Sequence, residues 1–235
     1  MAEGQAQRTL ENLNNEVIAC RRCPRLVEWR ERVAREKKRA YRDEDYWGRP
    51  LPSFGDPAAR LLIIGLAPAA HGGNRTGRMF TGDRSADALF IALHAAGCAN
   101  QTTSRRRGDG LTLTDAYITA AVRCAPPANK PTPEEMLACQ PYLEQEIALL
   151  LNVRVVVTLG KIAFDAYLRV AAKRGLTLPR PLPRFGHALA YRLAADWPLL
   201  LTSYHPSRQN TQTGRLTQEM LDSVFLRARQ AIASD

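Results

Sequence analysis

Five cysteines are the residues whose types and spacing point most directly to chemistry in this sequence. Cys20 and Cys23 form a C-x-x-C pair, and Cys124 and Cys139 follow with 14 residues between them. Four thiolates from two distant segments can hold a [4Fe–4S] cluster or a zinc ion. Structural zinc sites commonly use two C-x-x-C pairs, so the stretched second pair favours the cluster. The competing interpretation is that Cys124 and Cys139 are buried small hydrophobes, as we expect for Cys98.

Three polar segments form a second group of residues suited to chemistry. Residues 65–83 contain several glycines, whose backbone N–H groups can approach an anion or a carbonyl oxygen closely. Residues 203–211 place His205 beside short hydrogen-bond donors suited to phosphate. Asn129 lies in the proline-rich stretch 125–133. Each segment follows an apolar run of the sequence.

The elements that must position these segments alternate between strands and helices. Short runs rich in Ile, Val, Leu or Thr predict buried strands at residues 60–66, 116–122, 153–159 and 199–203. Helical spacing of apolar residues predicts helices at residues 10–18, 25–38, 85–96, 133–150, 161–173 and 217–233. The alternation predicts an α/β fold, a three-layer α/β/α sandwich around a four-stranded parallel sheet. In such folds the ligand site lies beyond the carboxyl ends of the strands.

The composition limits the class of protein. The 235 residues carry 33 Lys and Arg against 23 Asp and Glu, and a formal net charge of +10 fits a polyanion such as nucleic acid as partner. No apolar run approaches the roughly 18–20 residues needed to cross a membrane, and residues 1–15 are too polar for a signal peptide. We expect one cytoplasmic, nucleoid-associated domain of residues 1–235, a monomer, in which residues 1–55 form a helical and loop segment.

Four segments together resemble the family 5 uracil-DNA glycosylases, the B-type enzymes of bacteria and archaea. They are CRRCPRLVEWRE at 20–31, GLAPAAHGGNRTGRMFTGD at 65–83, TAAVRCAPPANKPTP at 119–133 and SYHPSRQNTQTGRLT at 203–217. The resemblance covers nearly the whole chain. It implies a monofunctional hydrolase that removes uracil from single- or double-stranded DNA and leaves an abasic site, with hypoxanthine and ethenocytosine as further substrates. It also implies a structural [4Fe–4S] cluster with the ligands Cys20, Cys23, Cys124 and Cys139.

The same resemblance implies roles for individual residues. The implied catalytic residues are Asp83 and Asn129, near the attacking water, and His205, the histidine of the family's third motif. Base binding is implied for Gly65, Ala69, His71 and Phe80, and DNA contacts are implied for Arg75, Ser207, Arg208, Gln209 and Asn210. Stacking of a flipped base on Phe80 is worth about 1–3 kcal/mol, and a donor from His205 to the base O2 stabilises the departing anion. We further expect phosphate contacts from the strand-end cations Arg75, Arg78, Arg123, Lys130 and Arg208.

Two departures from the wider superfamily affect mechanism and selectivity. Other uracil-DNA glycosylases carry Asp, Glu or Asn in the motif that begins at Gly65, where this chain has Leu66 and Ala67. No side chain at those positions can act as a base. Related enzymes also use an Asn to read uracil where Ala120 stands here, which predicts a less selective pocket.

Structural roles compete with several of these assignments. Asp83 precedes a predicted helix and can serve as its N-cap. Asn129 can hold the proline-rich turn, and Phe80 can be a core residue. The alternative function is a non-catalytic nucleic-acid-binding module that keeps the fold and the cluster without turnover.

Overall fold

Four runs of aliphatic residues form the parallel centre of a β-sheet in the computed structural model, which describes residues 2–234. They are β2 (Leu61–Gly65), β3 (Ala116–Ala120), β4 (Val155–Leu159) and β6 (Leu199–Ser203). The three central pairings, β3–β2, β2–β4 and β4–β6, are all parallel. Each strand lies within the range predicted for it, because a strand covered on both faces reads as a short apolar run.

The predicted four-stranded parallel sheet is wrong in strand number and in direction at its edges. The order is β1-β3-β2-β4-β6-β5, and the edge strands β1 (Phe54–Gly55) and β5 (Ala190–Arg192) run antiparallel to their neighbours. Strands of two and three residues are too short to leave an apolar or alternating pattern in the sequence. The sheet is therefore mixed and six-stranded.

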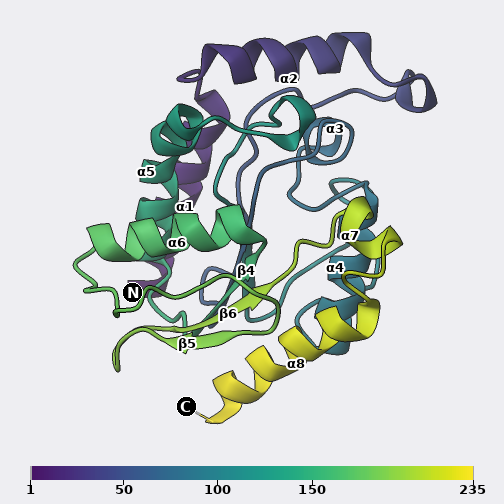
Figure 1. The fold of residues 1–235 in the computed structure, drawn as a ribbon. Coiled ribbons are helices and arrows are strands. Elements are labelled where there is room, and N and C mark those ends of the chain that lie inside the picture. Colours follow the sequence, from purple (N-terminus) through teal and green to yellow (C-terminus); the bar gives the residue numbers. More distant parts are fainter. Residues whose placement is uncertain (1, 235) are drawn as a thin grey trace.

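Helices cover both faces of the sheet, as the three-layer prediction requires (Figure 1). On one face, α4 (Arg84–Ala95) and α8 (Gln218–Ser234) pack against Ile63 and its neighbours. On the other face, α5 (Pro133–Leu149) and α6 (Lys161–Lys173) pack against Leu62 and its neighbours. The alternation of Leu62 and Ile63 between the two cores follows from the two-residue period of a strand.

The N-terminal helices α1 (Ala2–Ala19) and α2 (Pro24–Glu36) join the sandwich through a smaller third core. This core contains residues of both helices, of the loop after β3 and of α5: Leu13, Val17, Leu26, Val122, Cys124, Cys139 and Tyr142. A polar contact reinforces it, because Arg25 of α2 donates from Nε to Glu135 Oε1 at 2.7 Å. The two N-terminal helical segments predicted from the sequence are present.

Local capping determines where α5 begins. Thr132 Oγ1 accepts a hydrogen bond from Glu135 N at 3.3 Å, and Glu135 Oε2 accepts one from Thr132 N at 2.8 Å. This reciprocal capping box satisfies two backbone donors that a helix start leaves free. It fixes the end of the proline-rich stretch that carries Asn129.

Four short helical turns that the sequence pattern does not predict lie in the loops. They are α3 (Gly73–Thr76), α7 (Arg208–Gln212) and the 3₁₀ turns Arg39–Tyr41 and Pro127–Asn129. Each is five residues or shorter, so none has the length needed for a helical period. Among the described residues, no helix has both the length and the apolar character needed to span a membrane.

Candidate active site

A cleft lies beyond the carboxyl ends of β2, β3 and β6, where the polar segments follow the strands. Eight of the predicted site residues line it: Ala69, His71, Phe80, Asp83, Asn129, His205, Ser207 and Arg208. Four others, Gly65, Arg75, Gln209 and Asn210, do not. The fold thus brings three segments that are far apart in the chain to one site.

His205 follows β6 and lies against Phe80. The two rings are stacked, with centroids 5.9 Å apart and an interplanar angle of 28°. The His205 carbonyl accepts hydrogen bonds from Ser207 N at 2.7 Å and Asn210 Nδ2 at 2.8 Å, which fix the loop. Burial lowers the pKa of His205 to about 4, because the imidazolium loses contact with water. The ring is therefore neutral at pH 7 and offers one N–H donor.

Phe80 reaches the cleft through an uncommon backbone conformation. Its φ is +45°, in the left-handed region that a bulky residue adopts only when its surroundings impose it. A Cβ at Gly65 would lie 2.8 Å from Cε2 and Cζ of the Phe80 ring, too close for any side chain. Gly65 therefore supports Phe80 at the end of β2 and does not itself line the cleft.

Asp83 has both of the locations that its two alternative roles require, at the N-terminus of a helix and at the cleft. Its Oδ1 accepts a hydrogen bond from Ala86 N at 3.0 Å as the N-cap of α4, which confirms the structural role. The residue also lines the cleft. Burial raises the pKa of Asp83, and hydrogen bonds from the Ala86 and Ser85 backbone oppose that rise. The carboxyl group is thus held at a helix N-terminus beside the candidate substrate site.

Asn129 stands on the proline-rich loop at the cleft, and it is exposed. Ala128 and Asn129 have φ values of +51° and +55°, so two successive residues are in the left-handed region. Asparagine tolerates this conformation better than most residues. Asn129 therefore forms part of the proline-rich turn and also lines the cleft.

The N-terminal segment supplies part of the cleft that the sequence analysis did not assign. Trp29, Lys38 and Tyr41 line it, and the Tyr46 hydroxyl lies 3.0 Å from Nδ1 of His71. Burial lowers the pKa of His71, and the nearby positive charges act in the same direction. The signal that could have found this wall is the mixture of basic and aromatic residues in the segment KRAYRDEDYW at 38–47.

Three of the five arginines and lysines predicted to contact phosphate are buried in internal ion pairs. Arg75 pairs with Glu44 and donates to the carbonyls of His71 and Gly82. Arg78 pairs with Asp109 at 2.8 Å. Arg123 pairs with the fully buried Glu146. Their side chains are at most 10% exposed, so a DNA contact does not fit these three residues, whereas Lys130 and Arg208 are exposed.

The remaining predicted DNA-contact residues lie around α7. Ser207 is the N-cap of this helix, since its Oγ accepts from Asn210 N at 3.4 Å. Asn210 supports the His205 loop through its side-chain amide. Arg208 and Gln209 are exposed. The segment therefore has two supporting residues and two that face solvent.

The apolar positions that depart from the superfamily pattern also line the cleft. Leu66, Ala67 and Ala120 form part of its wall, so these three positions offer no group that can accept a proton. Thr119, beside Ala120, is buried and donates to Glu146 Oε2 at 2.6 Å. This part of the wall has no side-chain amide with which to read a base.

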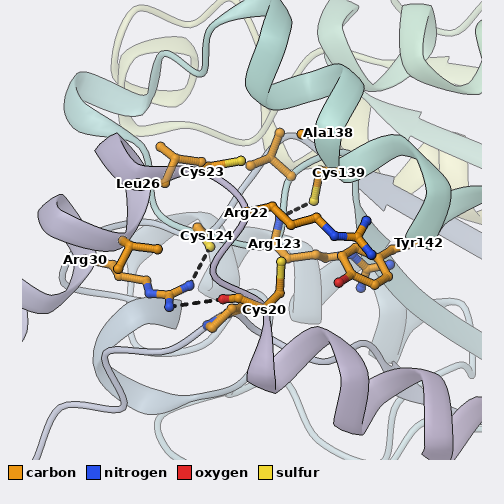
Figure 2. Close-up of a pocket in the computed structure, with 13 residues that line it drawn as sticks. Cys20, Arg22, Cys23, Leu26, Arg30, Arg123, Cys124, Ala138, Cys139 and Tyr142 are labelled. Carbon is orange, nitrogen blue, oxygen red and sulfur yellow. Dashed lines mark hydrogen bonds between the residues drawn. The ribbon is translucent and has the colours of Figure 1, made fainter.

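The four cysteines predicted as ligands line one pocket between α2, α5 and the loop after β3 (Figure 2). Cys98 lies elsewhere, in the core between the sheet and α4, where burial raises its pKa to about 11. Among residues 2–234, no three His, Cys, Asp or Glu side chains are close enough to bind a single metal ion. The four candidate ligands therefore lie together at one pocket, whereas Cys98 is a core residue, as predicted.

A buried cation shows that the pocket fits a negatively charged group. Arg30 of α2 is 2% exposed and donates from Nη1 to Cys124 Sγ at 2.9 Å and from Nη2 to the Cys20 carbonyl at 3.2 Å (Figure 2). Its ion pair with Glu31 is long, at 3.9 Å. A buried guanidinium needs an anion close to it, because the loss of water otherwise costs several kcal/mol. Cysteine thiolates that held a metal cluster would supply such charge.

Comparison with known proteins identifies the family. The family model described as "Uracil DNA glycosylase superfamily" matches residues 52–229. The chain belongs to this superfamily. It is 53% identical over 219 residues to a type-5 uracil-DNA glycosylase of Mycobacterium tuberculosis, covering 93% of this chain and 80% of the relative. It is 54% identical over 214 residues to the type-5 uracil-DNA glycosylase of Thermus thermophilus, covering 91% of this chain and 94% of the relative.

Among uracil-DNA glycosylases, the type-5 group is the one to which the chain belongs. A type-4 uracil-DNA glycosylase of Sulfurisphaera tokodaii is only 26% identical over 200 residues, covering 85% of this chain and 74% of the relative. The predicted resemblance to family 5 is therefore confirmed. The superfamily model begins at residue 52, whereas the type-5 alignments extend beyond its limits. Cys20, Cys23 and Arg30 lie in the part of the chain outside the superfamily match.

Proposed function

We propose that the protein is a monofunctional DNA glycosylase that hydrolyses the N-glycosidic bond of uracil in DNA and leaves an abasic site for base excision repair. The observation that carries this proposal is the convergence of Phe80, Asp83, Asn129 and His205 on one cleft at the carboxyl ends of the strands. The names of the type-5 relatives support the same activity.

The target base must leave the duplex before it can enter such a cleft. Extrusion costs a few kcal/mol and is easiest for a mismatched base, such as uracil opposite guanine. Stacking on Phe80 recovers about 1–3 kcal/mol of this cost. The fixed backbone at Phe80 and Gly65 keeps the ring in place before the base arrives.

His205 stabilises the departing base. Cleavage leaves negative charge on the base, and the neutral imidazole has one N–H that can donate to the base O2. A neutral donor stabilises the developing anion without giving up its proton, by the same electrostatic principle as an oxyanion hole. The half-buried position of the ring makes the interaction stronger than it would be in water.

Asp83 and Asn129 position the attacking water. Leu66 and Ala67 offer no base in the loop after β2, so the polar groups must come from elsewhere on the cleft. One oxygen of Asp83 accepts from the α4 backbone, which fixes the orientation of the carboxyl group. The second oxygen is then the one proposed to bind the water, together with Asn129.

The wall at Ala120 sets a broad base selectivity. A pocket that hydrogen-bonds one base rejects others because its own polar groups would be left unpaired. Ala120 has no polar group to leave unpaired, so hypoxanthine and ethenocytosine are proposed as additional substrates. The exposed cations Lys130 and Arg208 are proposed to contact the DNA backbone.

The cysteine pocket is proposed to hold a [4Fe–4S] cluster through Cys20, Cys23, Cys124 and Cys139. When bound, the cluster would link α2, α5 and the loop after β3 without taking part in electron transfer, because hydrolysis moves no electrons. Residues 1–55 would then be one part of a single domain of residues 1–235. A monomer acting on cytoplasmic, nucleoid DNA is the form that this proposal expects.

The test is an oligonucleotide with one uracil, incubated with the purified protein and then treated with alkali. Strand scission only after alkali would show an abasic product, and an uncut strand would contradict the proposal.

His205→Ala should lower the single-turnover rate by about 100-fold or more and leave DNA affinity nearly unchanged. His94→Ala, at an exposed position of α4, is the matched control and should leave both unchanged. Equal loss of cleavage and binding in H205A would favour a binding module.

A further inference from the structure

Arg30 makes contacts in two directions. Its guanidinium faces the cysteine pocket, where it donates to Cys124 Sγ and to the Cys20 carbonyl (Figure 2). Its backbone carbonyl accepts a hydrogen bond from Asn74 Nδ2 at 3.2 Å. One residue therefore contacts both the candidate cluster ligands and α3.

Asn74 lies within the loop that forms one wall of the active-site cleft. This loop, residues 65–83, carries His71 and Phe80 and ends at Asp83. Asn74 is fully buried, and its carbonyl accepts from Gly48 N at 3.0 Å. Its backbone N–H donates to the Ala69 carbonyl at 3.1 Å. Asn74 is thus a fixed point of the loop, held to α2 through Arg30.

We propose that Arg30 is a positioning residue that couples the cysteine pocket to the active-site loop. The guanidinium fixes α2 relative to Cys124, and the carbonyl of the same residue fixes Asn74 and the loop relative to α2. An occupied pocket therefore holds the loop in its catalytic conformation. The part of this inference that concerns turnover rests on the proposed activity, and the coupling rests on the proposed cluster but not on that activity.

The contact with sulfur gives the coupling a spectroscopic consequence. Hydrogen bonds to cluster sulfurs and positive charge beside them stabilise the reduced state, which carries more negative charge. Removing the guanidinium should therefore shift the cluster to a more negative reduction potential. A residue that only filled space would leave this potential unchanged.

The first experiment compares Arg30→Met and Arg30→Lys with Arg35→Met in protein purified without oxygen. Arg35 is an exposed arginine on the same helix and serves as the matched control. We expect R30M to lower the potential and to bind less iron per chain. R30K keeps the charge but loses the fork of donors and should lie between R30M and the wild type. R35M should match the wild type in both measurements.

The second experiment removes the other contact. Asn74→Leu keeps a similar side-chain volume but cannot donate to the Arg30 carbonyl. We expect N74L to retain the wild-type iron content and potential, whereas the backbone amides of residues 72–77 exchange hydrogen faster. R30M and R30K should accelerate exchange in the same amides, and R35M should not.

These outcomes separate the coupling from the proposed activity. Faster exchange at residues 72–77 in both N74L and an Arg30 variant supports the coupling, even if no variant and no wild-type protein releases uracil. The coupling is overturned if R30K and R30M both retain the wild-type reduction potential. It is also overturned if an Arg30 variant binds an altered amount of iron while hydrogen exchange at residues 72–77 stays unchanged. If the wild-type protein releases uracil, N74L should in addition lower kcat more than it raises KM, because the loop carries Asp83.

Discussion

The carboxyl group of Asp83 occupies the space that a side chain at residue 72 would need. A Cβ built on Gly72 would overlap Oδ2 of Asp83, while Oδ1 accepts from the α4 backbone. The absence of a side chain at Gly72 therefore lets the carboxyl group at the end of the active-site loop pack against the backbone at residue 72. The two residues stand eleven positions apart, in a loop that folds back on itself through α3.

Asp83 variants should separate capping from catalysis. Asn is as good an N-cap as Asp, so Asp83→Asn should keep the thermal stability and lower uracil release by about 100-fold. Asp83→Ala should lose both, with a loss of about 1 kcal/mol in the free energy of unfolding. Denaturant unfolding and single-turnover rates provide the two measurements. Wild-type turnover in D83N would exclude a role for the carboxylate beyond capping.

The low pKa of His205 gives its contribution to stability a definite pH dependence. The group has an ordinary pKa of 6.5 in the unfolded chain and about 4 in the folded protein. Below 6.5 the unfolded state binds the proton more readily, so His205 destabilises the fold progressively as the pH falls from 6.5 to about 4. Between about pH 7 and 8 it should have no effect of this kind. As the pH falls below 6.5, the melting temperature of the wild type should therefore fall more steeply than that of His205→Asn. Parallel plots of melting temperature against pH would contradict a neutral His205 in the folded protein.

The contact between Gly65 and Phe80 predicts a non-additive pair of substitutions. Gly65→Ala should displace the ring, and Phe80→Ala should remove it, so each should weaken binding of a flipped base by about 1–3 kcal/mol. The double variant should be no worse than Phe80→Ala alone, because the two substitutions affect the same interaction. Fluorescence titration with a uracil-containing oligonucleotide measures the three affinities. Additive losses would show that Gly65 acts separately from Phe80.

Two cysteines provide a matched comparison for the cluster. Cys139 lines the cysteine pocket, whereas Cys98 is packed in the core against α4. Cys139→Ala should lower the iron content and the melting temperature, and Cys98→Ala should keep the full iron content with a small loss of stability. Iron analysis and the visible absorption spectrum give the answer. Equal iron in the two variants would remove Cys139 from the ligand set.

Two arginines predicted to contact DNA should now behave differently. Arg208 is exposed at the cleft, so Arg208→Met should reduce the salt dependence of DNA binding by about one phosphate contact. Arg75 is buried and pairs with Glu44. Arg75→Met should therefore lower the melting temperature, and the salt dependence of DNA binding by the folded protein should stay unchanged. Binding measured at several salt concentrations separates the two. A smaller salt dependence of DNA binding in R75M would instead support the predicted contact between Arg75 and DNA.

The sequence pattern located the parallel strands and long helices because burial on both faces leaves uninterrupted apolar runs. It also placed the cleft, since the carboxyl ends of parallel strands meet at one edge of a sheet. The edge strands β1 and β5 could not be predicted in the same way. They are defined by pairing with β3 and β6, and a run of two or three residues is too short to show an apolar or alternating pattern.

Charge was the least reliable guide to the site. Arg78 and Arg123 stand on the predicted loops, but their partners Asp109 and Glu146 come from 31 and 23 residues further along the chain. No local pattern shows that such partners will bury a cation. Conversely, Lys38 and Tyr41 line the cleft although the sequence analysis assigned them no role in the site.

The backbone conformation around the cleft has a consequence for how this protein can evolve or be engineered. Phe80, Ala128 and Asn129 all have positive φ, and all three line the cleft. Conformations of this kind cost about 1–3 kcal/mol each and persist because the surrounding structure imposes them. Glycine at position 128 would adopt this conformation without that cost, yet it would also let the loop that carries Asn129 relax. Selection for thermal resistance alone would therefore tend to remove the strain that keeps this loop in one shape.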